Sequence, residues 1–231
     1  MKKKNTAMTK VNTIKQGGRA FTLCTVFMCM LLIGGCAMSG GGSDAETVAI
    51  GDQVWTTKNL NTPVFRNGDK IYHATTPEEW KQAAEEKRPA WCYMNHDSTL
   101  QGKFGKLYNW YAISDPRGLA PEGWHIPTDD EWEDLINHLG KDAGHKMKAS
   151  RNDIRSGTGN NRSGFTGMFG GYCMFNGQFT NRHVSGVWWS TTETDDEEER
   201  AWAIQLSSNK RKALRMKAYK VFGASVRCVK D

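Results

Sequence analysis

The sequence lacks the short motifs that mark the common enzyme and metal-binding classes. No serine stands in a Gly-x-Ser-x-Gly motif, and no phosphate-binding Walker loop is present. The six histidines form neither an H-x-x-x-H nor an H-E-x-x-H pair, so the chain has no zinc signature. It has no C-x-x-C either, which excludes a zinc knuckle and a thioredoxin-type redox pair. With no catalytic constellation in view, we predict that the protein is not an enzyme.

Long apolar runs are scarce as well. The one such run, residues 20–33, is shorter than the roughly 20 residues that span a bilayer. Basic residues precede it, and Gly34, Gly35 and Cys36 follow it, which is the order of a secretory signal. Its end resembles a bacterial lipobox, in which the cysteine carries fatty acids such as palmitate and becomes the first mature residue. We therefore expect a lipoprotein signal peptide over residues 1–35, lipid on Cys36 and a flexible tether over residues 36–46. Cleavage at a nearby site is the alternative.

Cleavage at this point removes the charge that would suggest a nucleic-acid partner. The formal net charge of +6 equals the six basic residues before Cys36, which no acidic residue accompanies. The rest of the chain is formally neutral and carries no electrostatic footprint for nucleic acid. We expect an extracytoplasmic protein, bound to the membrane by its N-terminal lipid at the outer membrane or cell surface. Of the cysteines, Cys92, Cys173 and Cys228 remain there, enough for one disulfide and one leftover thiol.

Capping signals predict two short helices in the mature chain. Thr76, Pro77 and Glu79 have the spacing of a capping box with proline at the first helical position. Thr128 and Glu131 form a second box, at the start of an amphipathic helix that ends at Gly140.

The rest of the chain reads as strands and loops. Residues 47–60 predict a hairpin, and residues 150–171, rich in Gly, Asn, Ser and Arg, predict a long surface loop. An antiparallel set of strands is expected over residues 172–179, 186–190, 201–206, 211–218 and 224–229. We predict a single α+β domain over residues 47–231.

Several landmarks occur in order along the chain, at residues 105–112, 119–132, 170–172, 188–193 and 225–231. Together they resemble the Fibrobacter succinogenes major paralogous domain. The resemblance implies a C-type-lectin-like fold, distantly similar to that of the formylglycine-generating sulfatase-modifying enzymes, and a lipoprotein form as in Bacteroidetes. It implies no activity, because the family is defined by sequence. Ala120 stands where many members have a cysteine, so pairing of Cys173 or Cys92 with Cys228 is left open.

Two groups of side chains are candidates for ligand contact. The adjacent Trp188 and Trp189 point to opposite faces of a strand, so one of them is a candidate for a surface ring that stacks on sugar. Arg211, Arg215 and Lys217 share one face of a basic strand and are candidates for contact with anionic polysaccharide; charge that guards an edge strand is the alternative. Five other tryptophans are expected in the core: Trp55, Trp110, Trp124, Trp132 and Trp202.

No cofactor is predicted. Calcium is a cation for which the sequence offers candidate ligands. The acidic run from Glu193 to Glu199 offers hard oxygens, but without the ligand spacing of a calcium loop. His125, inside a family motif, is expected to be a hydrogen-bonded structural residue.

We predict a non-enzymatic role in binding or displaying a glycan or protein ligand. A copper-dependent oxidase of the formylglycine-generating type is the alternative, and it requires two thiolates that converge on one metal. A structural subunit of a surface assembly is the third hypothesis, and the oligomeric state is left open.

Overall fold

The computed structural model describes residues 46–150, 158–195 and 199–231. The predicted signal peptide, Cys36 and the tether up to residue 45 lie outside the described residues. Within the described part of the chain, no helix is both long and apolar enough to span a bilayer.

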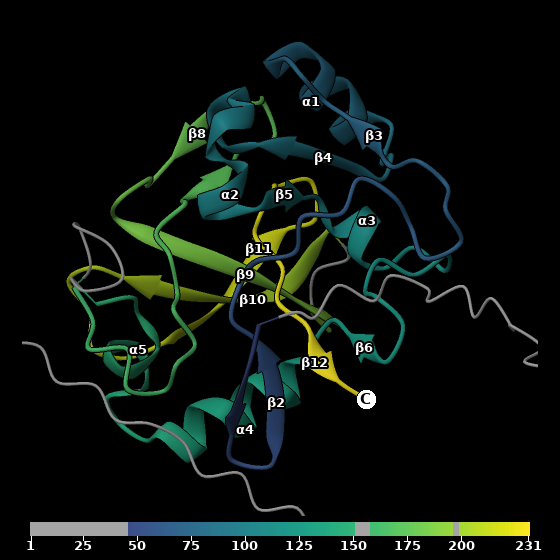
Figure 1. Cartoon of the computed structure of the whole chain (residues 1–231). Helices are drawn as coiled ribbons and strands as arrows, with labels where there is room; N and C mark the ends of the chain where they lie inside the picture. Colours follow the sequence, from purple (N-terminus) through teal and green to yellow (C-terminus); the bar gives the residue numbers. More distant parts are fainter. Residues whose placement is uncertain (1–45, 151–157, 196–198) are drawn as a thin grey trace, which may run out of the picture. The chain divides into compact units, whose positions relative to one another are not determined.

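The described residues form small, mostly antiparallel sheets and short helices, which confirms the α+β class (Figure 1). One sheet has the order β1-β2-β12-β6 and joins the two ends of the domain, because Val229 pairs with Trp55. Its strands are β1 (Thr47–Ile50), β2 (Gln53–Thr56), β12 (Val229–Lys230) and β6 (Trp124–His125). The predicted hairpin is β1 and β2.

The sheet with the longest strands, which we call the largest sheet, has the order β11-β10-β9 and is antiparallel throughout. Its strands are β9 (Ser185–Glu193), β10 (Arg200–Ser207) and β11 (Leu214–Tyr219). A third sheet contains β3 (Tyr72–His73), β4 (Ala90–Tyr93) and β5 (Lys106–Tyr108), and β7 (Tyr172–Cys173) pairs with β8 (Phe179–Thr180). Residues 224–229 do not extend the largest sheet as predicted, since they bridge several sheets through isolated pairs such as Trp188 with Ser225.

Both predicted helices are present. In α4 (Asp129–Leu139) the Thr128 hydroxyl accepts from the Glu131 backbone N–H, and the Glu131 carboxylate accepts from the Thr128 N–H. In α1 (Pro77–Glu85) the Thr76 cap is present, but the Glu79 carboxylate accepts from Thr75 instead, one residue before the cap. Shorter helical segments are η1 (Met94–His96), η2 (Ser98–Leu100), α2 (Gln101–Phe104), α3 (Trp110–Ile113) and α5 (Ala143–Met147).

Strand β9 is covered on both faces at Trp188 and Trp189, and this corrects the prediction for these two residues. Trp188 packs with Phe165 in one apolar cluster, whereas Trp189 packs with Trp110 and Val226 in another. Both indole rings are 0% exposed. Alternation along the strand does send the two rings to opposite faces, but neither face meets solvent, so neither ring is a surface sugar platform.

The predicted surface loop over residues 150–171 is also wrong in its described C-terminal part. Phe165 and Phe169 are buried in the cluster that contains Trp188, and Gly167 pairs with Lys148. Residues 151–157 lie outside the described residues. Of the tryptophans predicted in the core, Trp55, Trp110 and Trp132 are buried, while Trp124 and Trp202 are half-buried.

Candidate functional site

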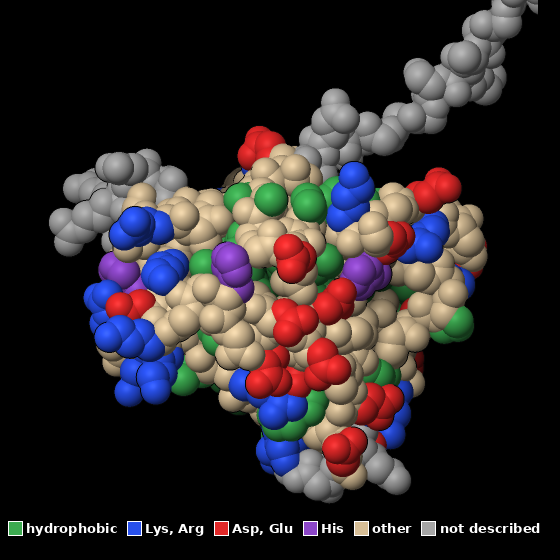
Figure 2. Space-filling view, turned by 90° about the horizontal axis from the view of Figure 1, so that it is seen from below, with side chains coloured by type: hydrophobic (Ala, Val, Ile, Leu, Met, Phe, Trp, Pro, Cys, Tyr) green, Lys and Arg blue, Asp and Glu red, His purple; other side chains and the backbone are tan. Residues whose placement is uncertain are grey.

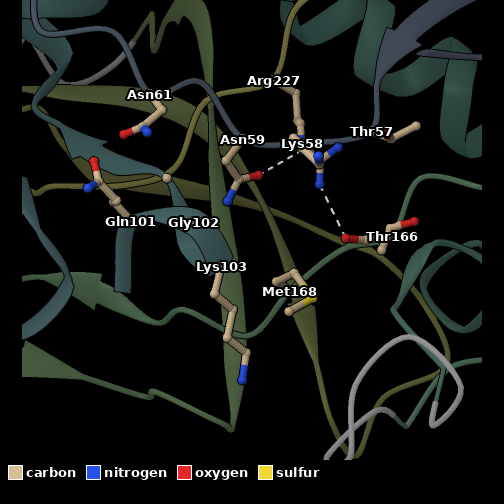
Figure 3. A pocket seen from close by; sticks show the side chains of 11 residues that line it. Thr57, Lys58, Asn59, Asn61, Gln101, Gly102, Lys103, Thr166, Met168 and Arg227 are labelled. Carbon is tan, nitrogen blue, oxygen red and sulfur yellow. Dashed lines mark hydrogen bonds between the residues drawn. The ribbon is translucent and has the colours of Figure 1, made fainter. Parts of the chain in front are cut away.

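A cleft of about 590 Å³ opens where three distant segments meet (Figure 3). The segment after β2 forms one wall, α2 forms the second, and the stretch before β7 forms the third. Arg227, just before β12, lies between them. The lining residues are Thr57, Lys58, Asn59, Asn61, Gln101, Gly102, Lys103, Gly105, Thr166, Met168 and Arg227.

Arg227 joins two of these walls, the segment after β2 and the stretch before β7, from a buried position. Its Nε donates to Asn59 Oδ1 at 2.7 Å, its Nη1 to the Thr56 carbonyl at 2.6 Å, and its Nη2 to the Thr166 carbonyl at 3.2 Å. The guanidinium also lies 4.6 Å from the ring centroid of Phe165. Arg227 is 1% exposed, and burial lowers its pKa to about 9, so it remains a cation near neutral pH.

Two glycines shape the wall formed by α2. Gly105 ends the helix with φ +68°, and a Cβ there would lie 2.7 Å from the Leu60 carbonyl oxygen. The residue must therefore be glycine for α2 to lie so close to the segment after β2. Gly102 differs, because a Cβ added to it would meet nothing within 4 Å. A larger side chain at Gly102, which is one of the lining residues of the cleft, therefore has open space.

The amide groups of the cleft have their oxygens occupied and their N–H groups available. Asn61 Oδ1 accepts from Lys106 Nζ at 2.7 Å, and Gln101 Oε1 accepts from the Tyr93 hydroxyl at 3.4 Å. No described residue accepts from Asn61 Nδ2 or from Gln101 Nε2. Asn59 is different, since its oxygen and its nitrogen are both bound within the fold. Asn59 therefore positions Arg227, while Asn61 and Gln101 present donors.

Cations dominate the electrostatics of the cleft, and none of the lining side chains is acidic. Lys103 is exposed on α2. Partial burial, together with the nearby cations Arg182 and Lys103, lowers the pKa of His183. Lys106 lies behind Asn61 at 3% exposure, and burial lowers its pKa too. Lys58, which also lines the cleft, forms an exposed ion pair with Glu46 at 2.7 Å.

The predicted basic strand does not form one binding face. Arg211 precedes β11 and binds Asp142 through two hydrogen bonds of 3.0 Å. Arg215 is ion-paired with buried Asp129, and its guanidinium lies 3.4 Å from the ring centroid of Trp202. Figure 2 shows the domain from below, with acidic side chains gathered in the middle of that face and one among the basic side chains at its left. Arg211 and Arg215 therefore have acidic partners within the fold.

Lys217 shares the face of Arg215, as period two predicts, and its Nζ lies 5.6 Å from the same Trp202 ring. The cleft is lined by none of the side chains that the sequence proposed for ligand contact, namely Trp188, Trp189, Arg211, Arg215 and Lys217.

The three cysteines that the structure describes are free, and Cys173 is not brought to Cys228. Cys228 lies in the cluster of Trp189, whereas Cys173 lies with Cys92 in a third cluster around Trp80. The thiols of Cys92 and Cys173 are in contact, and burial, with this contact, raises the pKa of Cys92. Burial also raises the pKa of Cys228, to about 12. The pairing of Cys173 or Cys92 with Cys228, which the sequence left open, is therefore corrected to a contact between two buried thiols, Cys92 and Cys173.

The acidic run and His125 have partners in the fold. Glu193 binds Lys220 at 2.6 Å and Glu199 binds Lys87 at 2.7 Å, while residues 196–198 lie outside the described part. Over the described ranges, no three His, Cys, Asp or Glu side chains gather as a metal site would require. His125 is hydrogen-bonded through Nδ1 to Asp231 and through Nε2 to Glu131, as a structural histidine is expected to be.

The comparison with known families decides what kind of domain carries this cleft. The family model of the Fibrobacter succinogenes major domain matches residues 48–230. The chain belongs to this family. No curated protein and no solved structure matches it. The matched range contains every residue of the cleft, so the cleft is a feature of the Fibrobacter succinogenes major domain in this chain and not of an appended segment.

Proposed function

We propose that this protein is a non-enzymatic binding protein, lipid-anchored through Cys36 at the outer membrane or cell surface, and that the cleft at Arg227 holds a glycan. The observation that carries the proposal is the cleft itself, whose unoccupied polar groups come from the segment after β2 and from α2, beside the buried Arg227. Its volume lies within the roughly 300–1,000 Å³ of small-ligand sites. A lectin-like fold, as the resemblance implies, is consistent with such a role.

Amide groups support a sugar in this cleft more than an apolar ligand. Asn61 and Gln101 each present an unoccupied NH₂ group, and hydroxyl oxygens of a sugar accept from such donors. Met168 is the only large apolar side chain in the lining. A ligand that binds there must satisfy donors, because a buried donor without a partner costs roughly 1–3 kcal/mol.

A glycan-array screen of the purified protein tests the proposed function. We expect binding that Gly102→Trp abolishes, because the indole would occupy the cleft, and that Gly102→Ala keeps. Both substitutions have room and need no change of backbone, since Gly102 lies in a helix with nothing within 4 Å of its Cβ position. An array on which the wild-type protein binds nothing would sink the glycan hypothesis, and equal binding by Gly102→Trp would place the site elsewhere.

The anchor has a separate test. Metabolic labelling of cells with an alkyne fatty acid is expected to mark the wild-type protein and not Cys36→Ser. Protease treatment of intact cells then distinguishes surface display from a protected, periplasmic domain. Label on Cys36→Ser would contradict lipidation at this cysteine.

The oxidase alternative now has a definite pair of thiols, because Cys92 contacts Cys173. Both thiols are 0% exposed within an apolar cluster, which argues against a substrate reaching them. Copper-dependent oxygen uptake that is lost in Cys92→Ser would favour the oxidase over the binding protein. A stable partner that co-purifies in the absence of any small ligand would favour the structural subunit.

A further inference from the structure

The hydrogen-bonding groups in the cleft are unequally divided between donors and acceptors. Asn61 and Gln101 have their oxygens occupied and their nitrogens available, and Lys103 contributes an ammonium group. Thr57 and Thr166 donate their hydroxyl hydrogens to the Glu46 and Gly164 carbonyl groups, and Thr166 also accepts from Asn161. Their oxygens keep lone pairs that can accept, but the N–H groups of Asn61, Gln101 and Lys103 outnumber these acceptors. A matching ligand must therefore be rich in acceptors, which is the property of anionic oxygen more than of a hydroxyl group.

Two buried cations beside the cleft differ from several other cations of the domain, including Lys58 of the cleft, which pairs with Glu46. Arg211, Arg215 and Lys220 each contact a carboxylate. Arg227 and Lys106 are buried, yet neither contacts a carboxylate among the described residues. A buried cation is normally paired, because the interior solvates charge poorly.

Backbone and amide oxygens satisfy these two cations only in part. Arg227 has five N–H groups and three described acceptors, which leaves one N–H on each terminal nitrogen. Lys148, a buried lysine remote from the cleft, shows the contrast, since three carbonyl groups accept from its three N–H groups. Full satisfaction by carbonyl groups thus occurs in this fold, but not at the cleft.

We infer that the ligand of the cleft is an acidic saccharide, whose carboxylate or sulfate group lies over Arg227 and accepts from Lys103, Asn61 and Gln101. This inference rests on the proposed function and names the class of glycan. Arg227, at 1% exposure, acts through its charge at the floor of the cleft. The exposed Lys103 makes the direct charged contact from α2.

Calorimetric titration of the detergent-purified full-length protein tests the charge of the ligand. The probes are an oligogalacturonate, which carries carboxylates, the same oligosaccharide with its carboxyl groups reduced, and a heparin-derived oligosaccharide, which carries sulfates. We expect one or both acidic probes to bind and the reduced, neutral probe to bind at least about tenfold more weakly. The two acidic probes separate carboxylate from sulfate as the recognised group.

Lys103 is the residue to change, because Arg227 also holds three segments together and its loss would disturb the fold. Lys103→Gln is expected to weaken binding of the acidic probe about fivefold, as for one exposed charge pair, and Lys103→Glu by more. Lys81→Gln, an exposed lysine on α1 paired with Glu85, is the matched control and is expected to leave the affinity unchanged. Binding of the acidic probe is also expected to weaken with added salt.

The failures of the two proposals are distinguishable. If the neutral probe binds as tightly as the acidic ones and Gly102→Trp blocks it, the cleft is a glycan site but the acidic class is wrong. If Lys103→Glu binds the acidic probe as well as the wild type does, the inference is wrong as well. If no probe binds and the glycan array is blank, the proposed function itself is wrong.

Discussion

Arg215→Met tests the conclusion that the basic segment stabilises the fold and does not bind a ligand. The Asp129 side chain is 5% exposed, its Oδ2 contacts Arg215, and no described group binds its Oδ1. Loss of Arg215 therefore leaves a buried carboxylate without its cation and also removes the contact with the Trp202 ring. Breaking a fully buried pair costs about 3–5 kcal/mol. Because Arg215 is itself 49% exposed, water can replace part of this interaction, and we expect a loss of about 2 kcal/mol.

Arg211→Met is the matched control for this experiment. Arg211 also forms a pair with an aspartate, but its side chain is 62% exposed and that of Asp142 is 31% exposed. Such a pair contributes at most about 1 kcal/mol. Urea unfolding followed by tryptophan fluorescence measures both variants, and Asp129→Asn added to Arg215→Met is expected to recover part of the loss. Equal losses in the two single variants, or no recovery in the double variant, would refute the reasoning.

Three further predictions concern stability and thiol chemistry. Burial would lower the pKa of His125, but the hydrogen bonds to Asp231 and Glu131 outweigh it and raise this pKa above 6.5, its value in the unfolded chain. The charged imidazole therefore stabilises the folded protein fully below pH 6.5, and this contribution is lost as the pH rises through the folded pKa. In urea unfolding, His125→Gln should therefore cost about 1 kcal/mol at about pH 6 and much less at about pH 9; an equal loss at both would refute the charge on His125. Gly171 has φ +70°, and a Cβ added there would lie only 2.1 Å from the Thr180 carbonyl oxygen. Gly171→Ala should therefore lower the free energy of unfolding by at least about 2 kcal/mol, and an unchanged midpoint of urea unfolding would contradict this. Iodoacetamide followed by mass spectrometry should modify the three described cysteines only after denaturation, because all are buried; rapid labelling of the native protein would show otherwise.

Local signals in the sequence predicted the regular elements well. Thr128, Glu131 and Gly140 mark the ends of α4 because helix caps depend on residues within one turn. The class of the fold and the antiparallel strands over residues 186–190, 201–206 and 211–218 followed from similarly local patterns.

Features that depend on contacts between distant segments were not predictable in the same way. Whether Trp188 and Trp189 meet solvent depends on what covers each face of β9, and those covers come from distant parts of the chain. The composition of residues 163–171 suggested a loop on the surface, but Phe165 and Phe169 anchor this stretch in the core.

The cleft belongs to this second kind of feature. Asn61, Lys103 and Arg227 come from three separate segments, and no spacing rule relates them. The one signal in the sequence was Arg227, a charged residue between Val226 and Cys228 in a segment predicted as a strand. The interpretation of the basic segment failed for a related reason, because Asp129 and Asp142, which bind its arginines, lie far away in the sequence.

The central claim is that the cleft beside Arg227 is where this domain binds its ligand. Hydrogen–deuterium exchange of the full-length protein, with and without the acidic oligosaccharide that binds in calorimetry, tests it most directly. The account predicts slower exchange in residues 57–61, 101–105 and 166–168, the segments that line the cleft, and no such change in Gly102→Trp. Protection confined to β11, around Arg215 and Lys217, would contradict it.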